Sequence, residues 1–482
     1  MMSVPYDSEE FYNARVRQQA FEGAVTNYRM EQKGLVAGDA DVLAARELQL
    51  LWQRSHHAVR NNGWAKTAKR KNLINLNSIN VKWKDDKGKV NKKMQAIWDE
   101  FAKDPNLDGY GTLDNTQEAW NGAMFESGEA LCRMIIKKRD GFTVPLVLQN
   151  IESEYLDPIF QNKDPLTTRN SIKFVDSKPS IYYFSKRNPG FTQFSAMSME
   201  KVEVAAEEVL HIFIRDRPGQ WRGVPTLAPI LLPLYELDDL TDATVAKQKA
   251  AQAISWVIRN TNPSSAMAVG SALNTVDPND IDKSTGKRRV VSQASGGGVQ
   301  YLNKGEDIAF YQGTDIGANL PELIKAELHK IAQTAGLSYE VLTGDLTGIS
   351  FSALQQVAID MKTQAEFMYK FYIINLGLAP LCKRFQELAV IYGSKNFANL
   401  TPTFQYPRKY GVNDLKDAQA DLLEVQSGFA TWESKLEERN LTVEEITEDK
   451  KRQSEAGVSF EPSVPTSSQS KNVKPNSNSA GM

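Results

Sequence analysis

The sequence predicts an α+β protein that is rich in helix. Apolar residues recur at helical spacing in residues 1–131 and again in residues 319–455. Between 144 and 214 the spacing changes towards two, in short β-branched or aromatic runs separated by Pro, Asn, Asp and Gly. Helices and strands are therefore segregated along the chain, which is typical of the α+β class.

Length and composition limit the possible functions. A chain of 482 residues is long enough for about three domains, and 41% apolar residues predict sizeable cores. The net charge of −2, from 57 Lys+Arg and 59 Asp+Glu, indicates no global field for nucleic acid, a membrane or acidic partners. Cys132 and Cys382 are predicted to be reduced, buried thiols. No apolar run approaches the roughly 18 residues of a membrane span, and the acidic N-terminus has no apolar signal core, so we expect a soluble, non-secreted protein.

The first part of the chain is predicted to be helical, with one strand at its end. A short helix over Asn91–Lys103 carries Met94, Ile97, Trp98 and Phe101 on one stripe. The basic segment AKTAKRKN is interpreted as a solvated helix face, not as a phosphate contact. The other predicted elements are helices over Glu9–Tyr28, Ala40–Asn61, from Trp64 onward and Thr116–Leu131, and a strand over Leu131–Ile136.

The middle of the chain leads from strands to a long helix. The predicted strands are Val144–Gln149, Ser171–Val175, Ile181–Phe184 and Val209–Ile214. In the stretch from His211 to Asn260, Pro218–Gly219 marks a turn, and Pro225, Pro229 and Pro233 follow at intervals of four. Because proline kinks a helix interior, we expect regular helix from Leu234 to the end of that stretch.

Charges along this helix are interpreted as matching its dipole. Alanines between the charged ends predict close packing against several neighbours. The acidic residues are Glu236, Asp238, Asp239 and Asp242, and the basic ones are Lys247, Lys249 and Arg259.

Beyond this helix we expect a mostly β module and then further helices. Residues 261–319 are rich in Ser, Asn, Gly and Asp, with strand candidates at Arg288–Ser292, Val299–Leu302 and Ile308–Tyr311. Asn319 and Pro321 indicate the start of a second helix that stops at Gly336. A strand or turn is predicted for Leu337–Leu342, then a loop with Gly344 and Gly348. Ser350 caps a third helix, which Gly377 and Pro380 are expected to break.

The C-terminal part of the chain is predicted to be mostly helical. The remaining predictions are a helix over Leu381–Tyr392, a strand over Thr401–Tyr406, helices over Asp414–Gln426, Thr431–Arg439 and Thr442–Glu455 (with a capping box of Thr442 and Glu445), and a disordered tail from Gly457.

Catalytic motifs are missing from the sequence. It has no P-loop, no GxSxG elbow, and no HExxH or CxxC spacing, so we predict no catalytic residues, no metal and no cofactor. The acidic residues of 236–242 leave one alternative, a metal-dependent nuclease or other hydrolase. Only Asp238 and Asp242 share a helix face, which favours dipole matching over a metal site.

Two blocks of the sequence resemble the signature regions of the lambda family of tailed-phage portal proteins. The first is RPGQWRGVPTLAPIL, followed by ELDD and an Ala/Lys-rich helix, and the second is GLSYEVLTGDLTGISFSALQQ. Weaker similarity covers most of the chain, with departures at Pro233 and at Ser350–Phe351. The matching residues are Arg217, Pro218, Gly219, Gln220, Gly223, Pro225, Leu237, Asp238 and Asp239 in the first block, and Gly336, Tyr339, Glu340, Gly344 and Asp345 in the second.

The resemblance implies a ring, usually of twelve copies, at one capsid vertex. Such a ring is the channel through which terminase packs DNA, and it serves DNA retention, ejection and head–tail joining. The implied partners are further copies of the chain, double-stranded DNA passing through without sequence preference, the terminase large subunit, the major capsid and scaffolding proteins, and a head-completion or adaptor protein of the neck, with no membrane. The implied location is the virion, and the host cytoplasm during assembly. The implied layout is a wing (1–224), a first stem helix (225–259), a clip (260–318), a second stem helix (319–342), a channel loop (343–352), a long helix with the rest of the wing (353–412), a crown (413–456) and a disordered tail (457–482).

The same resemblance suggests which residues face DNA. A conduit must not hold DNA, and in a ring one basic residue per subunit becomes a belt of positive charge, so few are expected. Each basic candidate is also open to the interpretation of a solvated residue, and the loop residues to packing against a neighbouring subunit. The candidates are Asp345, Leu346, Thr347 and Ile349 in the channel loop, Lys325 and Lys330 in the stem, and Lys283, Lys287, Arg288 and Arg289 in the clip.

Overall fold

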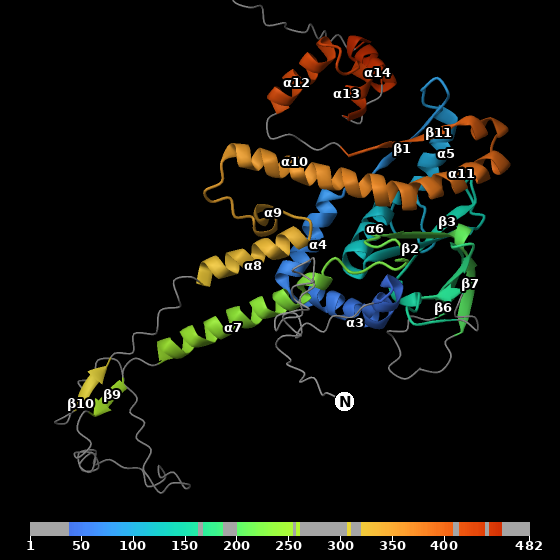
Figure 1. Ribbon diagram of the computed structural model, residues 1–482. Coiled ribbons are helices and arrows are strands. Elements are labelled where there is room, and N and C mark those ends of the chain that lie inside the picture. The colour runs from blue at the N-terminus through green and yellow to red at the C-terminus, as the bar shows by residue number, and fades with distance from the viewer. Residues whose placement is uncertain are drawn as a thin grey trace, which may run out of the picture. The chain divides into compact units, whose positions relative to one another are not determined.

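The computed structural model divides the chain into two compact units (Figure 1). The first unit consists of Met1–Ile74, Trp120–Leu131 and Ile151–Gly348, and the second of Asn75–Ala119, Cys132–Asn150 and Ile349–Met482. Helices predominate and strands are present in both units, so the predicted α+β class is confirmed. The structure describes residues 38–161, 167–186, 200–253, 257–260, 306–309, 320–407, 414–438 and 443–455.

The first unit begins with two helices. Helix α3 (Ala40–Asn61) has the predicted bounds and starts at Asp39, whose side chain accepts a hydrogen bond from the Asp41 amide. Its buried face includes Leu48 and Trp52. Helix α4 (Gly63–Asn75) follows after Asn62. The helix predicted over Glu9–Tyr28 lies outside the described residues.

Four strands of the first unit form an antiparallel sheet with the order β4-β5-β6-β7. Asn170–Ser171 and Asp176–Ser177 join neighbouring strands with positive φ angles of 49° to 64°. Asn and Asp tolerate this conformation better than most residues, which suits tight hairpin turns. Strands β4 and β7 were missing from the prediction. Strand β4 has only two residues, whereas β7 alternates charged and apolar residues, a strand pattern that the prediction overlooked. The bounds are β4 Thr168–Arg169, β5 Ile172–Val175, β6 Lys178–Ser185 and β7 Lys201–Ala205.

Strand β2 continues from the first unit into the second. Helix α6 (Leu113–Ser127) precedes β2 (Glu129–Ile136), as predicted apart from small shifts of the bounds. Strand β2 is the central strand of a three-stranded sheet with the order β3-β2-β8, between β3 (Leu146–Ile151) and β8 (Val209–Phe213). Buried residues of β2, β5, β6, β7 and β8, together with Leu156, form a hydrophobic core of the first unit.

An aromatic core holds the second unit together. Trp83, Trp98, Phe101 and Phe385 lie with ring centroids 4.9 to 6.2 Å apart. They come from β1 (Asn80–Lys84), α5 (Lys92–Lys103) and α11 (Ala379–Tyr392). Strand β1, which was not predicted, pairs antiparallel with the predicted strand β11 (Thr401–Gln405). Cys132 and Cys382 are buried and form no disulfide, as predicted.

Helix α7 (Leu231–Ala253) differs from its prediction at both ends. It starts before Pro233, after a 3-10 turn over Ala228–Ile230, because the first helical turn needs no amide donor from a proline. It ends at Ala253, before the predicted end at Asn260. Val257 and Ile258, whose β-branched side chains favour a strand, belong to β9 (Val257–Asn260). The first turn therefore holds no acidic residue and the last turn no basic one, so the predicted dipole matching is wrong.

Strand β9 pairs antiparallel with β10 (Glu306–Ala309), which overlaps the predicted strand at 308–311. The strands predicted at 288–292 and 299–302 lie outside the described residues. Helix α8 (Leu320–Thr334) is followed by the short helix α9 (Tyr339–Thr343), where a strand or turn was expected. Ser338 caps α9 and the left-handed Gly344 ends it, so these five residues can close one helical turn.

The chain does not break at Gly377 and Pro380, contrary to the prediction. Helix α10 (Phe351–Met368), capped by Ser350 as predicted, continues through a π-helical segment, η7 (Tyr369–Leu378), into α11. The Ala379 amide bonds to the Ile374 carbonyl, five residues back. Pro380 then occupies the start of α11, where its missing amide donor is tolerated.

Three further helices follow β11 near their predicted positions. These are α12 (Asp414–Gln426), α13 (Trp432–Glu438) and α14 (Val443–Glu455). Thr442, expected to cap α14, and the tail from 457 lie outside the described residues. None of the described helices is long and apolar enough to cross a membrane. Short 3-10 turns lie at Ser153–Tyr155, Ala206–Glu208 and Lys395–Asn399.

Candidate functional site

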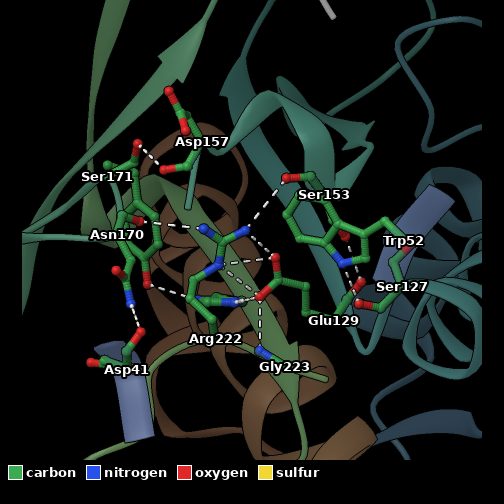
Figure 2. Close-up of polar contacts among 12 residues, drawn as sticks. Asp41, Trp52, Ser127, Glu129, Ser153, Asp157, Asn170, Ser171, Arg222 and Gly223 are labelled. Carbon is green, nitrogen blue, oxygen red and sulfur yellow. Dashed lines mark hydrogen bonds and ion pairs between the residues drawn. The ribbon is translucent and has the colours of Figure 1, made fainter. Parts of the chain in front are cut away.

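The first signature block builds a buried ion pair between Arg222 and Glu129 (Figure 2). Both side chains are fully buried. The Arg222 Nε lies 3.0 Å from each carboxylate oxygen of Glu129, and Nη2 donates to the same carboxylate. The backbone amide of Gly223 also donates to Glu129 Oε2, at 3.0 Å. The carboxylate is therefore surrounded by donors from a segment 93 residues away in sequence.

His211 and Tyr182 extend this network. His211 Nε2 lies 3.1 Å from Glu129 Oε2, and His211 Nδ1 lies 3.3 Å from the Tyr182 hydroxyl. His211 belongs to β8 and Tyr182 to β6, so the network connects three strands with the signature segment. His211 thus acts as an internal hydrogen-bonding partner.

The remaining donors of Arg222 are also used inside the protein. Nη1 donates to the Asn170 carbonyl at 3.4 Å and Nη2 to the Ser153 carbonyl at 3.5 Å (Figure 2). The guanidinium carbon lies 5.5 Å from the centre of the Trp52 ring. With every contact internal and the group fully buried, Arg222 serves the fold and is not presented to a ligand.

Gln220 shapes the turn that precedes Arg222. Its Oε1 accepts from the amides of Asp216 and Arg217 at 3.1 and 3.3 Å, and its Nε2 donates to the Arg222 carbonyl at 2.8 Å. The Arg217 guanidinium donates to the Gly38 carbonyl at 3.3 Å. Pro218 and Gly219 lie within this turn, as the sequence predicts, and the Arg217 carbonyl accepts the Gln220 amide at 3.0 Å.

Two glycines allow the backbones on either side of the ion pair to touch. A Cβ on Gly223 would lie 2.0 Å from the Gly128 carbonyl oxygen, and one on Gly128 would lie 2.2 Å from the Val224 carbonyl carbon. Gly128 also has a φ of 87°, which disfavours any other residue. Immediately afterwards the Pro225 carbonyl accepts the Ala228 amide at 2.9 Å, which begins the lead-in to α7.

Sequence reasoning missed Glu129 as the partner of Arg222. The available signal was the segment ESGEALCR, in which a carboxylate starts an otherwise apolar strand. An ionisable residue in such a strand is rarely buried unless it is paired. Local sequence, however, cannot say which distant cation pairs with it.

The network lowers the pKa of Glu129. Burial alone raises the pKa of this carboxyl, but the charge of Arg222 and the hydrogen bonds from His211 and Arg222 outweigh burial and hold it at about 2. The ordinary value is 4.5, so the folded state favours the carboxylate.

We expect the protein to lose stability in acid because of this group. A pKa that is lower in the folded than in the unfolded chain contributes stability above 4.5, and that stability disappears as the pH falls from 4.5 towards 2. The shift corresponds to about 3 kcal/mol. Urea unfolding between pH 7 and pH 3 should show this loss in the wild type and less of it in Glu129→Gln, where no carboxyl titrates at this position. Equal acid sensitivity in both proteins would contradict the assignment.

A second group of hydrogen-bonded side chains contains a serine, a histidine and a carboxylate. It lies at the C-terminal end of helix α6. His56 Nε2 lies 3.1 Å from Ser127 Oγ, and His56 Nδ1 lies 3.3 Å from Glu154 Oε1. Beside it, the Trp52 indole donates to the Ser127 carbonyl at 2.8 Å, and the Ser55 hydroxyl to the Glu126 carbonyl at 2.7 Å. Helix α3 thus supplies donors to the last carbonyls of α6, which otherwise lack partners.

The acidic residues of α7 do not gather into a metal site. Asp238 Oδ2 accepts a hydrogen bond from Asn62 Nδ2 at 2.8 Å, and Leu237 beside it is buried. Glu236, Asp239 and Asp242 are exposed. Among the described residues, no cluster of three or more His, Cys, Asp or Glu side chains has a metal-binding arrangement. This arrangement lends no support to the nuclease alternative.

The two stem candidates Lys325 and Lys330 occupy different sides of α8. Residues five apart differ by about 140° around a helix. The Lys325 Nζ lies 5.3 Å from the centre of the Tyr339 ring, whereas Lys330 pairs with Glu327 at 3.5 Å. Both lysines are exposed.

The second signature block places α9 and the loop that follows. Gly336, with a φ of 71°, ends α8, and the Glu340 carbonyl accepts the Gly344 amide at 2.8 Å. Of the candidate channel residues, Leu346 and Thr347 are exposed, and Asp345 and Ile349 are half-buried. The clip candidates Lys283, Lys287, Arg288 and Arg289 lie outside the described residues.

Large parts of α7 and α8 have no partner within the described chain. The two helices contact each other, and each has buried residues, Leu237 in α7 and Leu328 in α8. From 241 to 249 every α7 residue is exposed except the half-buried Thr244, and Val245 is 44% exposed. In α8, Leu320–Ala326 contains only exposed or half-buried residues, with Leu323 50% exposed.

These features define a helix-rich α+β protein whose signature residues serve structure and whose paired helices have long exposed stretches in the described part of the chain. The model of the family described as phage portal protein, lambda family, matches residues 26–368, and the chain belongs to that family. It is therefore a portal protein of a phage or a phage-derived particle. A probable portal protein of Halomonas phage phiHAP-1 is 25% identical over 411 residues, which cover 80% of this chain and 76% of the relative.

The solved structures that match this chain include a chain from the neck of an empty GTA particle. It is 14% identical, covers 82% of this chain and 94% of that one, and has a TM-score of 0.48. The HK97 family phage portal protein from Corynebacterium diphtheriae is 12% identical, covers 77% of this chain and 96% of that one, and has a TM-score of 0.29.

Proposed function

We propose that copies of this chain assemble into a ring-shaped channel for double-stranded DNA at one capsid vertex. The observation that carries the proposal is the exposure of α7 and α8 in a member of the portal family. A helix that is exposed almost all round gains little from its own subunit, because most helical stability in proteins comes from packing one face. Neighbouring copies would supply that packing, and the alanines at 243 and 246 would permit close approach.

The charges near the second signature block suit a conduit. The exposed loop tip carries Leu346 and Thr347 and no cation. Since each phosphate neutralised by a basic residue adds affinity, a tip without cations would let the duplex slide. Lys325 and Lys330 point to different sides of α8, so they would not both line one channel surface. Lys325, whose Nζ lies near the Tyr339 ring of α9, is the better candidate for a belt of positive charge around the channel.

The family layout assigns the other parts and partners. The wing (1–224 and 353–412) would hold the ring in the capsid, the stem helices (225–259 and 319–342) would surround DNA, and the crown (413–456) would lie inside. The clip (260–318) would face the terminase large subunit during packaging and a head-completion or adaptor protein later. Major capsid and scaffolding proteins would meet the ring during assembly, for which the family resemblance implies twelve copies. We assign no catalytic step and no cofactor.

Removal of the loop tests this assignment. We expect deletion of Asp345–Ile349 to leave the ring intact, because the exposed stem faces are unchanged, and to reduce the DNA retained in filled particles. Electron microscopy of the purified protein would count the copies, and packaged DNA would be measured after nuclease treatment of particles.

A milder variant for comparison is Leu346→Ala, which shortens the side chain at the tip and keeps the loop. We expect intact rings and an intermediate loss of retained DNA. Normal DNA yield and retention in the deletion variant would contradict the channel position of the loop. Monomers or dimers under all assembly conditions would contradict the ring itself.

A further inference from the structure

The loop between α9 and α10 is folded on itself. Asp345 Oδ1 accepts hydrogen bonds from the Thr347 amide at 3.0 Å and from the Thr347 hydroxyl at 2.6 Å. Gly344 and Gly348 flank this turn with φ angles of 74° and 75°. A Cβ at either glycine would meet open space, so glycine is needed there for its left-handed conformation alone. The turn presents Leu346, which is 55% exposed.

Tyr339 fastens this turn to α8. Its hydroxyl donates to Asp345 Oδ2 at 3.4 Å. The His329 ring stacks on the Tyr339 ring with centroids 4.3 Å apart and planes 22° apart. The Lys325 Nζ lies 5.3 Å from the centre of the same ring. We call Lys325, His329, Tyr339 and Asp345 the Tyr339 clamp.

The turn is also tied to α9. The Asp345 amide donates to the Thr343 hydroxyl at 3.1 Å, and that hydroxyl donates to the Tyr339 carbonyl at 2.8 Å. The hydrogen bonds from Thr347 lower the pKa of Asp345, which favours its charged carboxylate form. Few torsions remain free between Gly344 and Gly348, so individually weak contacts are sufficient to order the turn.

We infer that the Tyr339 clamp makes the loop a rigid extension of α8, with Tyr339 as its positioning residue. Leu346 then moves together with α8 and does not move independently of that helix. The inference deepens the proposed function and rests on it for the position of the loop in the channel. In a ring, each copy would hold one apolar tip at a radius set by α8, and a shift of α8 would be transmitted to the duplex.

A spin label at the tip tests rigidity directly. The native Cys132 and Cys382 are buried, so a label on Leu346→Cys reports this site, and unsubstituted protein is the labelling control. A label on Ala326→Cys, at an exposed position of α8, is the reference. We expect electron paramagnetic resonance spectra that are typical of slow, restricted label motion at both positions.

Substitutions in the Tyr339 clamp should change the motion of the label at the tip but not that of the label on α8. In the double variant Tyr339→Phe with His329→Ala, we expect the tip spectrum to shift to a fast component while the Ala326→Cys spectrum stays unchanged. Asp345→Ala should give the same shift. Asp345→Asn keeps both acceptor roles at Oδ1, and its amide nitrogen in place of Oδ2 can donate to the Tyr339 hydroxyl oxygen, so its spectrum should remain slow. Tyr110→Phe is the matched control, because Tyr110 is 75% exposed and remote from α8 in sequence.

A fast tip spectrum without clamp substitutions, or a slow one that persists in both Asp345→Ala and the double variant, would overturn the inference. Electron microscopy of the same samples reports the ring separately. If the tip is slow but no ring forms, the proposed function fails and the clamp stands. If rings form but the tip is fast, the clamp fails and the ring stands.

Discussion

Glu129→Ala is expected to destabilise the first unit by about 3–5 kcal/mol, because it leaves the buried Arg222 charge without its partner. Typical domains are stable by only about 5–15 kcal/mol, so much of the protein should unfold or fail to accumulate. The expected result is a large fall in the urea midpoint, or insoluble protein on expression. His211 and the Gly223 amide lose their acceptor in the same variant, which adds to the effect.

Two further variants distinguish a broken ion pair from a general packing loss. Glu207→Gln removes an exposed carboxylate of the same unit and should change stability little. Replacing both partners, as Glu129→Leu with Arg222→Met, should recover part of the loss, since no unpaired charge remains buried. A double variant less stable than Glu129→Ala would show that the network matters for reasons other than the lone charge.

Gly223→Ala is the second substitution with a large expected effect. Its Cβ would lie 2.0 Å from the Gly128 carbonyl oxygen and 2.4 Å from its carbon. Overpacking usually costs about 1–3 kcal/mol, and we expect the upper end or more because the obstacle is backbone, not a mobile side chain. Separation of the two segments would also lengthen the hydrogen bond from the Gly223 amide to Glu129. Thermal unfolding should show a markedly lower midpoint.

Gly63→Ala is the matched control for this prediction. Nothing lies within 4 Å of a Cβ at Gly63, which belongs to α4. Alanine is a better helix former than glycine, so stability should stay the same or rise. If Gly223→Ala and Gly63→Ala unfold at the same midpoint, the close approach at Gly128 has been wrongly assigned.

The sequence predicted most elements whose signal is local. Helices α3 and α12 have the predicted bounds, and Ser350 caps α10, because capping residues and apolar spacing lie within the element itself. The errors occur where two local rules compete. Pro233 was expected to delay α7, but the first turn tolerates proline. Pro380 was expected to break a helix, but a π-helical segment accommodates it.

The functional candidates divide in the same way. The signature blocks identified the family from sequence, and the family match over 26–368 confirms it. The roles within the blocks were not readable, because Arg222, Gly223 and His211 all depend on Glu129. Likewise Tyr339 and Asp345 were recognised as motif residues, while their link to Lys325 and His329 on α8 was not.

By itself, then, the sequence determined the helix-rich α+β class, most element positions and membership of the portal family, since these depend on residue spacing over a few turns or on a recognisable motif. Only the tertiary structure decided which residues meet. The 93 residues between Glu129 and Arg222 carry no pattern that pairs them, because burial of an ion pair depends on how distant segments pack. The bare faces of α7 and α8 are likewise visible only in the fold, since residue type alone does not show which side of a helix has a neighbour.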